Sequence, residues 1–284
     1  MKSYLKWAAV AVVLLLALVG AAFVVVFVAM QFGLLNVRGS IADRNAFFTG
    51  SATTTIPAQP CTDDGVQVCA WDQTPEWSVV KGGLQKDASI IARVSQETGV
   101  SGRMIATVVV PEQTRFFTSN REVFKRYFEP LKILGSLSQF SLGVSGIKEE
   151  TANNIEMYAN DPASPFYPGP QIEKLLAYNA TSTLDHNTAL FNRLTDAKDH
   201  YYSLLYTAAY IKEIESQWSR AGFDISKSPE AIATLFNVGF AASNPNANPK
   251  SAGAPITTGG NTYVYGTLGA LFYNSDELSD IFSK

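Results

Sequence analysis

Apolar and polar positions divide the chain into three parts, and the first part is an unbroken apolar run. From Trp7 to Met30 every residue is apolar or glycine, and no charged residue occurs between Lys6 and Arg38. A run of roughly 20 apolar residues crosses a bilayer as a helix, because a helix satisfies its own backbone groups in lipid. A cleavable signal peptide would have a shorter apolar region, about 7–15 residues, followed by a small-residue cleavage site. We therefore predict an uncleaved membrane anchor within residues 1–35.

The second part, residues 36–83, lacks a helical period. Residues 39–60 are rich in Ser, Thr and Ala and end in prolines, which is typical of a linker. Cys61 and Cys69 follow, eight positions apart, and they are the only cysteines. Two cysteines that close a small loop favour a disulfide and an oxidising compartment outside the cytoplasm, with two free thiols as the alternative. The pattern predicts a linker with a small disulfide loop and an irregular lead-in.

The third part, residues 84–284, has the apolar spacing of helices. Ile90 and Val94 share one face of its first helix, and Gly99 suits that helix's C-terminus. Helices are expected over residues 85–99, 102–110, 121–134, 147–159, 171–178, 184–194, 200–220 and 229–237, with a short one at the end. Pro111 is expected to kink or end the second helix. Alternating strand patterns are almost absent, so the predicted fold class is mainly α.

Composition and charge narrow the classes of function. The 284 residues are 46% hydrophobic and 17% charged, which suits one globular domain with appendages. The net charge is −3 and no basic cluster is interleaved with aromatic residues, so nucleic acid is excluded as a partner. The two histidines, His186 and His200, are far in sequence from both cysteines, so no metal site and no cofactor are expected.

One carboxylate stands out from the rest of the third part. Glu112 lies in the stretch VVVPEQTRFF, residues 108–117, between valines and phenylalanines. An apolar environment disfavours the carboxylate anion, so we expect the pKa of Glu112 to lie above the roughly 4.3 of a free glutamate. A carboxylic acid with a raised pKa can act as a general acid near neutral pH. The alternative is an ordinary solvated glutamate at a helix end.

Three later segments give Glu112 a context. They are SLSQFSLGVSGIKEETA (136–152), YTAAYIKEIESQW followed by AIATLFNVG (206–218 and 231–239), and GGNTYVYG (259–266). In this order they resemble the lytic transglycosylases of the lysozyme-like fold, in a divergent form, over residues 84–275. Gln113 follows Glu112 where that family usually has Ser, and Phe236 precedes Asn237 where it has Tyr.

The resemblance implies a role for each matching residue. Glu112 would protonate the glycosidic oxygen and then act as a base. Asn237 or the preceding Phe236 would contact the sugar or the neighbourhood of Glu112, although Asn237 could simply cap a helix. The remaining substrate-binding residues implied by the resemblance are Ser138, Gln139, Tyr263 and Tyr265. The two tyrosines also suit the core, and Gln139 also suits an exposed turn.

No second carboxylate is obviously paired with Glu112, whereas ordinary glycosidases need two. A transglycosylase needs only one, because a hydroxyl of the substrate replaces water. The predicted function is therefore a membrane-anchored, extracytoplasmic enzyme that cleaves the MurNAc–GlcNAc bond of peptidoglycan and leaves 1,6-anhydromuramoyl products. One alternative is a non-catalytic glycan-binding or scaffold protein of a cell-envelope or secretion assembly. Another is hydrolysis of chitin or chitosan. Ser-x-x-Lys occurs at Ser78 and Ser145 without the Lys-Thr-Gly that penicillin-interacting enzymes require.

Overall fold

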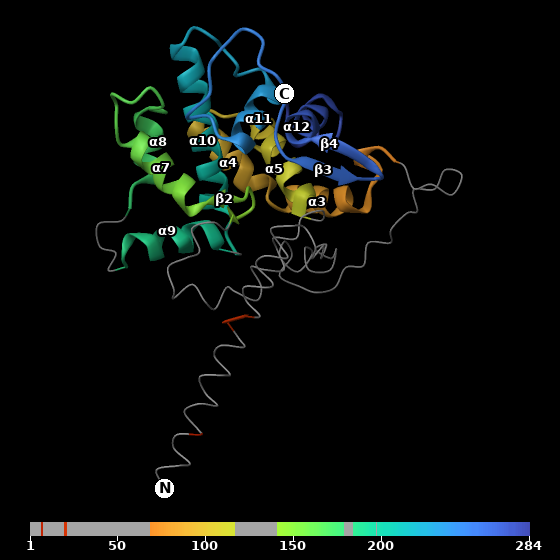
Figure 1. Ribbon diagram of the computed structural model, residues 1–284, viewed down its shortest axis with the longest axis horizontal. Coiled ribbons are helices and arrows are strands. Elements are labelled where there is room, and N and C mark those ends of the chain that lie inside the picture. The colour runs from red at the N-terminus through yellow and green to blue at the C-terminus, as the bar shows by residue number, and fades with distance from the viewer. Residues whose placement is uncertain (1–6, 8–19, 22–68, 117–140, 179–183, 197) are drawn as a thin grey trace.

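The computed structural model describes residues 69–116, 141–178, 184–196 and 198–284, together with residues 7, 20 and 21. These residues form a mainly helical domain (Figure 1). Among them, no helix is both long enough and apolar enough to cross a membrane. The expected anchor over residues 7–30 lies outside the described residues except for three positions, so it stays a prediction.

The expectation of a mainly α fold is confirmed for the described residues, although the short helix expected at the end of the chain lies earlier, over residues 265–274. The helices are η1 (Trp71–Gln73), α3 (Pro75–Lys86), α4 (Ala88–Thr98), α5 (Gly102–Phe116), α7 (Glu149–Ala159), α8 (Pro170–Leu176), α9 (His186–Thr195), α10 (Tyr201–Arg220), α11 (Pro229–Val238) and α12 (Tyr265–Asn274). Their ends follow local signals: Gly99 ends α4 in the left-handed conformation, and Asp185 caps α9 by accepting the amide of Thr188. The expected helix over residues 121–134 lies outside the described residues.

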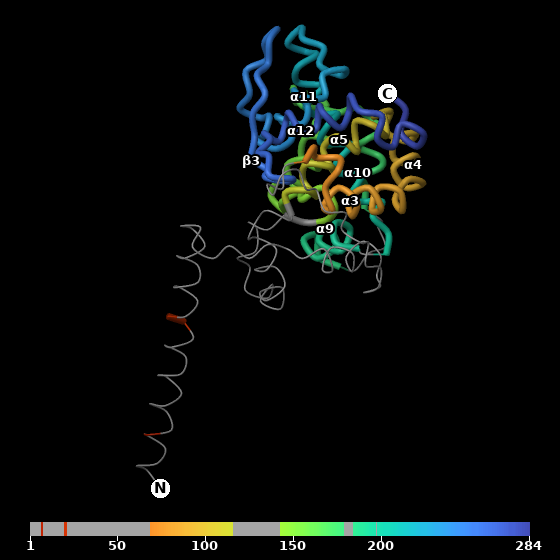
Figure 2. Tube along the Cα trace, turned by 90° about the vertical axis from the view of Figure 1, so that its right-hand side faces the viewer, coloured from red at the N-terminus to blue at the C-terminus, as the bar shows by residue number. Residues whose placement is uncertain are grey.

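The core lies around α5 and α10. In Figure 1, α4, α5, α10 and α11 occupy the middle of the molecule, between α7, α8 and α9 on one side and α3 and α12 on the other. Figure 2 shows the same arrangement from the side, with α9 at the lower edge. α5 packs against α3, α4, α10, α11 and α12, and its Ile105, Val108 and Val110 are fully buried. The valines before Glu112 therefore belong to the core.

Of the two outcomes expected at Pro111, a kink or the end of the helix, the second is wrong, because α5 continues through Pro111 to Phe116. Proline has no N–H, which leaves the carbonyl of Thr107 without its usual helical donor. α12 approaches at this level: a Cβ on Gly269 would lie 2.9 Å from the Thr107 carbonyl oxygen. One residue later, the Tyr265 hydroxyl donates to the carbonyl of Val108 at 2.7 Å. Contacts with α12 thus support the helical turn that carries Glu112.

Two short antiparallel hairpins were not expected from the sequence. β1 (Ser141–Leu142) pairs with β2 (Ile147–Lys148), and β3 (Pro255–Thr258) pairs with β4 (Asn261–Val264). Gly259 and Gly260 join β3 to β4 with φ of 58° and 76°. A two-residue turn of this kind needs positive φ at both positions, which glycine adopts without strain. This Gly-Gly pair was the signal in the sequence for the second hairpin.

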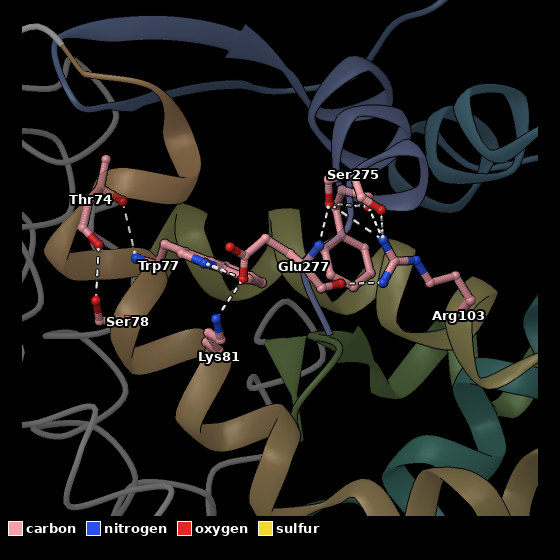
Figure 3. A network of polar contacts seen from close by, with 8 residues as sticks. Thr74, Trp77, Ser78, Lys81, Arg103, Ser275 and Glu277 are labelled. Carbon is pink, nitrogen blue, oxygen red and sulfur yellow. Dashed lines mark hydrogen bonds and ion pairs between the residues drawn. The ribbon is translucent and has the colours of Figure 1, made fainter. Parts of the chain in front are cut away.

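The interpretation of residues 61–83 as an irregular lead-in is wrong for residues 75–83, which are helical and packed into the core. Thr74 caps α3 by accepting the amide of Trp77, and Trp77 and Val80 are buried. At the other end of the domain, Glu277 accepts a hydrogen bond from the Trp77 indole at 3.3 Å and pairs with Lys81 at 2.8 Å (Figure 3). The folded domain therefore starts before residue 84.

Arg103 joins α5 to the C-terminal end of α12. Its guanidinium is buried and donates to four backbone carbonyls, those of Phe272, Tyr273, Ser275 and Glu277. Figure 3 shows Arg103 with Ser275 and Glu277. The four carbonyls lie in or just beyond the last turn of α12, where helical carbonyls lack partners along the helix. Arg103 thereby satisfies them and fixes the chain end against α5.

Cys69 marks the start of this domain. Its amide donates to the carbonyl of Gly259 at 2.8 Å, and its own carbonyl accepts from the side chain of Asn261 at 3.0 Å. No free thiol occurs among the described residues. Cys61 lies outside them, so its pairing with Cys69 stays a prediction.

Candidate active site

A pocket of about 380 Å³ opens beside Glu112. Its walls come from the end of α5, the β1–β2 turn, the start of α7, the middle of α10 and the end of α11. The lining residues are Glu112, Arg115, Ser145, Gly146, Ile147, Lys148, Thr151, Tyr210, Phe236, Asn237, Val238 and Gly239. The pocket therefore brings together Glu112, Phe236 and Asn237, which the sequence analysis selected from segments more than a hundred residues apart.

Glu112 lies one residue after Pro111, and its side chain is 13% exposed. Its Oε1 accepts a hydrogen bond from Nη2 of Arg115 at 2.7 Å, in an ion pair between positions i and i+3 of α5. A neighbouring guanidinium favours the carboxylate anion, whereas burial favours the neutral acid. The surroundings of the carboxylate are thus more polar than the flanking valines and phenylalanines suggested.

The turn between β1 and β2 packs directly against the side chain of Glu112. A Cβ on Gly146 would lie 2.2 Å from Oε1 of Glu112, and Gly146 has a φ of 65°. Gly143, at the start of the turn, has a φ of 68° and lies as close to Ser203 of α10. Both positions need glycine, for conformation and for space. The turn therefore holds the carboxylate from one side.

Buried polar contacts fix this turn to α5 and α10. The amide of Val144 donates to Oγ of Ser203 at 2.9 Å, and the side chain of Gln113 donates to the carbonyl of Val144. The hydroxyls of Ser145 and Thr207 bond to each other. Gln113 therefore joins α5 to the β1–β2 turn. Ser145 is buried in these contacts.

The opposite wall is the C-terminal end of α11. Asn237 Oδ1 accepts the amide of Ala254 at 2.8 Å, which fixes the loop between α11 and β3. Within the described part of the chain, the Nδ2 group of Asn237 has no hydrogen-bond partner and can donate to a ligand. Phe236 is largely buried and packs edge-on against Tyr210, with ring centroids 5.1 Å apart. Asn237 is thus partly a structural cap and partly available to the pocket.

Tyr263 and Tyr265 do not line the pocket, contrary to the expectation that they contact substrate. Tyr265 is fully buried behind Glu112, and its hydroxyl donates to Val108, one turn before the carboxylate. Burial, with a smaller contribution from the nearby Glu112, raises the pKa of Tyr265. Tyr263 lies in β4 and packs partly buried against the core. Tyr265 therefore supports α5, the helix that carries Glu112, through this hydrogen bond.

Ser138 and Gln139 lie outside the described residues, so their expected roles stay predictions. Arg115 and Lys148, the two cations of the described lining, were not expected from the sequence. A signal existed for Arg115, because residues three positions apart face each other on a helix.

The chain matches no protein-family model, no curated protein and no solved structure. The argument for a function therefore depends on the chemistry of this pocket.

Proposed function

We propose that this protein is a lytic transglycosylase with a lysozyme-like domain that cleaves the glycan strands of peptidoglycan. The observation that carries the proposal is the position of Glu112. It is the only carboxylate among the described residues that line the pocket, and it is held between Arg115 and the glycine of the β1–β2 turn. Asn237 supplies an amide on the opposite wall.

In the proposed reaction, Glu112 donates its proton to the oxygen of the MurNAc–GlcNAc bond as the bond from C1 to that oxygen breaks. Positive charge develops at C1, as in other glycosidases. The Glu112 carboxylate then accepts the proton of the C6 hydroxyl of the same muramic acid while that oxygen bonds to C1. The carboxylic acid is regenerated, and the product carries a 1,6-anhydro ring. The intramolecular hydroxyl has a large effective concentration relative to water.

The described lining of the pocket contains no carboxylate besides Glu112, which supports this outcome over hydrolysis. An inverting glycosidase activates water with a carboxylate roughly 6.5–9.5 Å from the acid, and a retaining enzyme needs one closer still. Among the described residues, Glu149 and Glu150 are near the pocket in sequence, but neither lines it. They begin α7, where acidic side chains complement the helix dipole.

The proposed setting is the outer face of a membrane. The apolar run over residues 7–30 would anchor the chain, and a disulfide between Cys61 and Cys69 would suit an oxidising compartment. Peptidoglycan strands would be the substrate within reach.

A second candidate is a non-catalytic glycan-binding or scaffold protein of a cell-envelope or secretion assembly. The observation that favours it is the ion pair of Glu112 with Arg115, since a general acid must hold a proton that this pairing opposes. Such a protein would use the pocket for binding and would not need Glu112 for turnover.

Replacing Glu112 tests the proposal. Glu112→Gln keeps the size of the side chain but removes proton transfer, so we expect lysis of purified peptidoglycan to slow by at least about a hundredfold. Release of soluble muropeptides is the measurement, and circular dichroism checks folding. Glu149→Gln is the matched control and should retain activity. Normal turnover by Glu112→Gln, with loss in Glu149→Gln, would show that the wrong residue has been chosen.

A further inference from the structure

Lys148 is a cation of the pocket that the proposed mechanism does not use. It is the last residue of β2, immediately before α7, and it is partly buried in the pocket wall. Within the described residues it forms no ion pair, although Glu149 and Glu150 follow it directly in sequence. Lys148 therefore lines the pocket without an ion pair to any described carboxylate.

The side-chain charges of the pocket lining indicate which kind of ligand the Lys148 ammonium favours. When Glu112 is ionised it neutralises Arg115 at 2.7 Å, and the charge of Lys148 is the net side-chain charge of the described lining; when Glu112 carries its proton, Arg115 adds to that positive charge. The whole chain, in contrast, has a net charge of −3. A local positive charge on an acidic protein favours an anionic group of the ligand at this position.

The neighbouring groups suit the same kind of ligand. Thr151, on the first turn of α7, lines the pocket with a hydroxyl, and Asn237 offers its Nδ2 group from the opposite wall. Hydroxyl and amide N–H groups donate hydrogen bonds, and an ionised carboxylate only accepts them. An ammonium with such donors around it matches a carboxylate better than it matches a neutral sugar hydroxyl.

We propose that Lys148 makes the pocket selective for glycans that carry a carboxylate beside the cleaved bond; this inference rests on the proposed function. Muramic acid provides such a group in two forms. In strands without stem peptides, the lactyl substituent ends in a free carboxylate. In strands with stem peptides, the lactyl group is an amide and the carboxylates belong to the peptide. Chitin has neither, so Lys148 would discriminate against it.

Binding can be measured without turnover in the full chain carrying Glu112→Gln. The ligands are a MurNAc–GlcNAc tetrasaccharide without peptides, the same tetrasaccharide with stem peptides, and the N-acetylglucosamine tetramer. We expect the further change Lys148→Gln to weaken binding of at least one carboxylate-bearing ligand by about tenfold, the scale of a hydrogen bond to a charged group. Binding of the uncharged tetramer should not change.

Two further variants separate the charge of Lys148 from general effects. Lys148→Arg keeps the positive charge and should preserve the selectivity. Lys174→Gln removes an exposed lysine of α8 that does not line the pocket, and it should bind all three ligands as the parent does. Because Arg115 has the same environment in every variant of this series, the difference isolates Lys148.

The outcomes distinguish this inference from the proposed function. Loss confined to the peptide-free ligand identifies the lactyl carboxylate, and loss confined to the peptide-bearing ligand identifies the stem. An equal loss for all three ligands, or no loss for any, overturns the role of Lys148 and leaves the catalytic proposal to its own assay. If the protein binds none of the glycans, both proposals are overturned.

Discussion

Glu213 is an unusual residue of the described core. It lies on α10, its side chain is fully buried, and neither of its carboxylate oxygens has a hydrogen-bond partner in the structure. Burial raises the pKa of Glu213 well above its ordinary value of 4.5. Burying an ionised carboxylate without a hydrogen-bond partner costs free energy, so the folded protein favours the neutral acid.

The raised pKa of Glu213 predicts how the free energy of unfolding depends on pH. Below pH 4.5 Glu213 is protonated in both the folded and the unfolded states. Above it, the unfolded chain loses the proton first, so the folded state loses stability as the pH rises towards the raised pKa. Glu213→Gln cannot ionise and does not lose this stability. Over that range, its free energy of unfolding minus that of the unmodified protein should increase by about 1.4 kcal/mol per pH unit.

Urea unfolding between pH 5 and pH 8, followed by tryptophan fluorescence, measures this slope. Glu215→Gln is the matched control, because Glu215 lies on the same helix and pairs with Lys212 at 2.9 Å near the surface. Its effect should stay below about 1 kcal/mol at every pH. Parallel pH curves for Glu213→Gln and the unmodified protein would contradict the buried neutral acid.

At the scale of single residues, the sequence predicted some of the pocket and missed the rest. Glu112 and Asn237 were selected because their neighbours in sequence resemble known motifs, and both line the pocket. Lys148 lies within one of the matching segments, residues 136–152, but the resemblance assigns it no role, because its place in the pocket depends on how a turn and a helix start are arranged in space. Tyr265 was selected as a substrate-binding residue, but its hydroxyl donates to the backbone of α5.

At the scale of elements, the β1–β2 turn gives the sharpest prediction. A Cβ on Gly146 would collide with the Glu112 carboxylate at 2.2 Å, so Gly146→Ala must displace Oε1. Displacement of a catalytic group by about 1 Å can lower the rate about a hundredfold. We expect peptidoglycan lysis to fall on that scale while the protein remains folded.

Gly99→Ala is the control for backbone strain. Gly99 has a φ of 73°, close to the 65° of Gly146, but a Cβ there would meet no atom within 4 Å. Both variants should lose about 1–2 kcal/mol of stability from the left-handed conformation. Only Gly146→Ala should lose activity. Equal activities of the two variants would mean that the turn does not position Glu112.

The helices were predictable from sequence because each repeats apolar positions over several turns. The hairpins were not, since β1 and β2 are two residues long and β3 and β4 are four. Strands this short contain too few positions for an alternating pattern to stand out. α3 was missed for a different reason: most of its residues were assigned to the irregular lead-in, although Pro75–Lys86 form a helix that includes Gly82 and Gly83.

At the scale of the whole molecule, the folded part extends from the contacts of Cys69 with Gly259 to the C-terminal residues held by Arg103. Cys69, at the start, bonds to the β3–β4 hairpin, and the C-terminal residues are held at the end of α12. In the proposed arrangement, the linker from the membrane would therefore join the domain beside the β3–β4 turn, where Cys69 is fixed. The pocket is built from other elements: the ends of α5 and α11, the middle of α10, the β1–β2 turn and the start of α7.

The central claim is that one carboxylate, Glu112, cleaves a glycosidic bond without a second acid to activate water. Mass spectrometry of the muropeptides released from purified peptidoglycan tests it directly. The account predicts 1,6-anhydromuramoyl ends, lighter by one water than the hydrolytic products, and none of them when Glu112→Gln is used. Products with reducing muramic acid ends alone would contradict it, because they would require a second carboxylate.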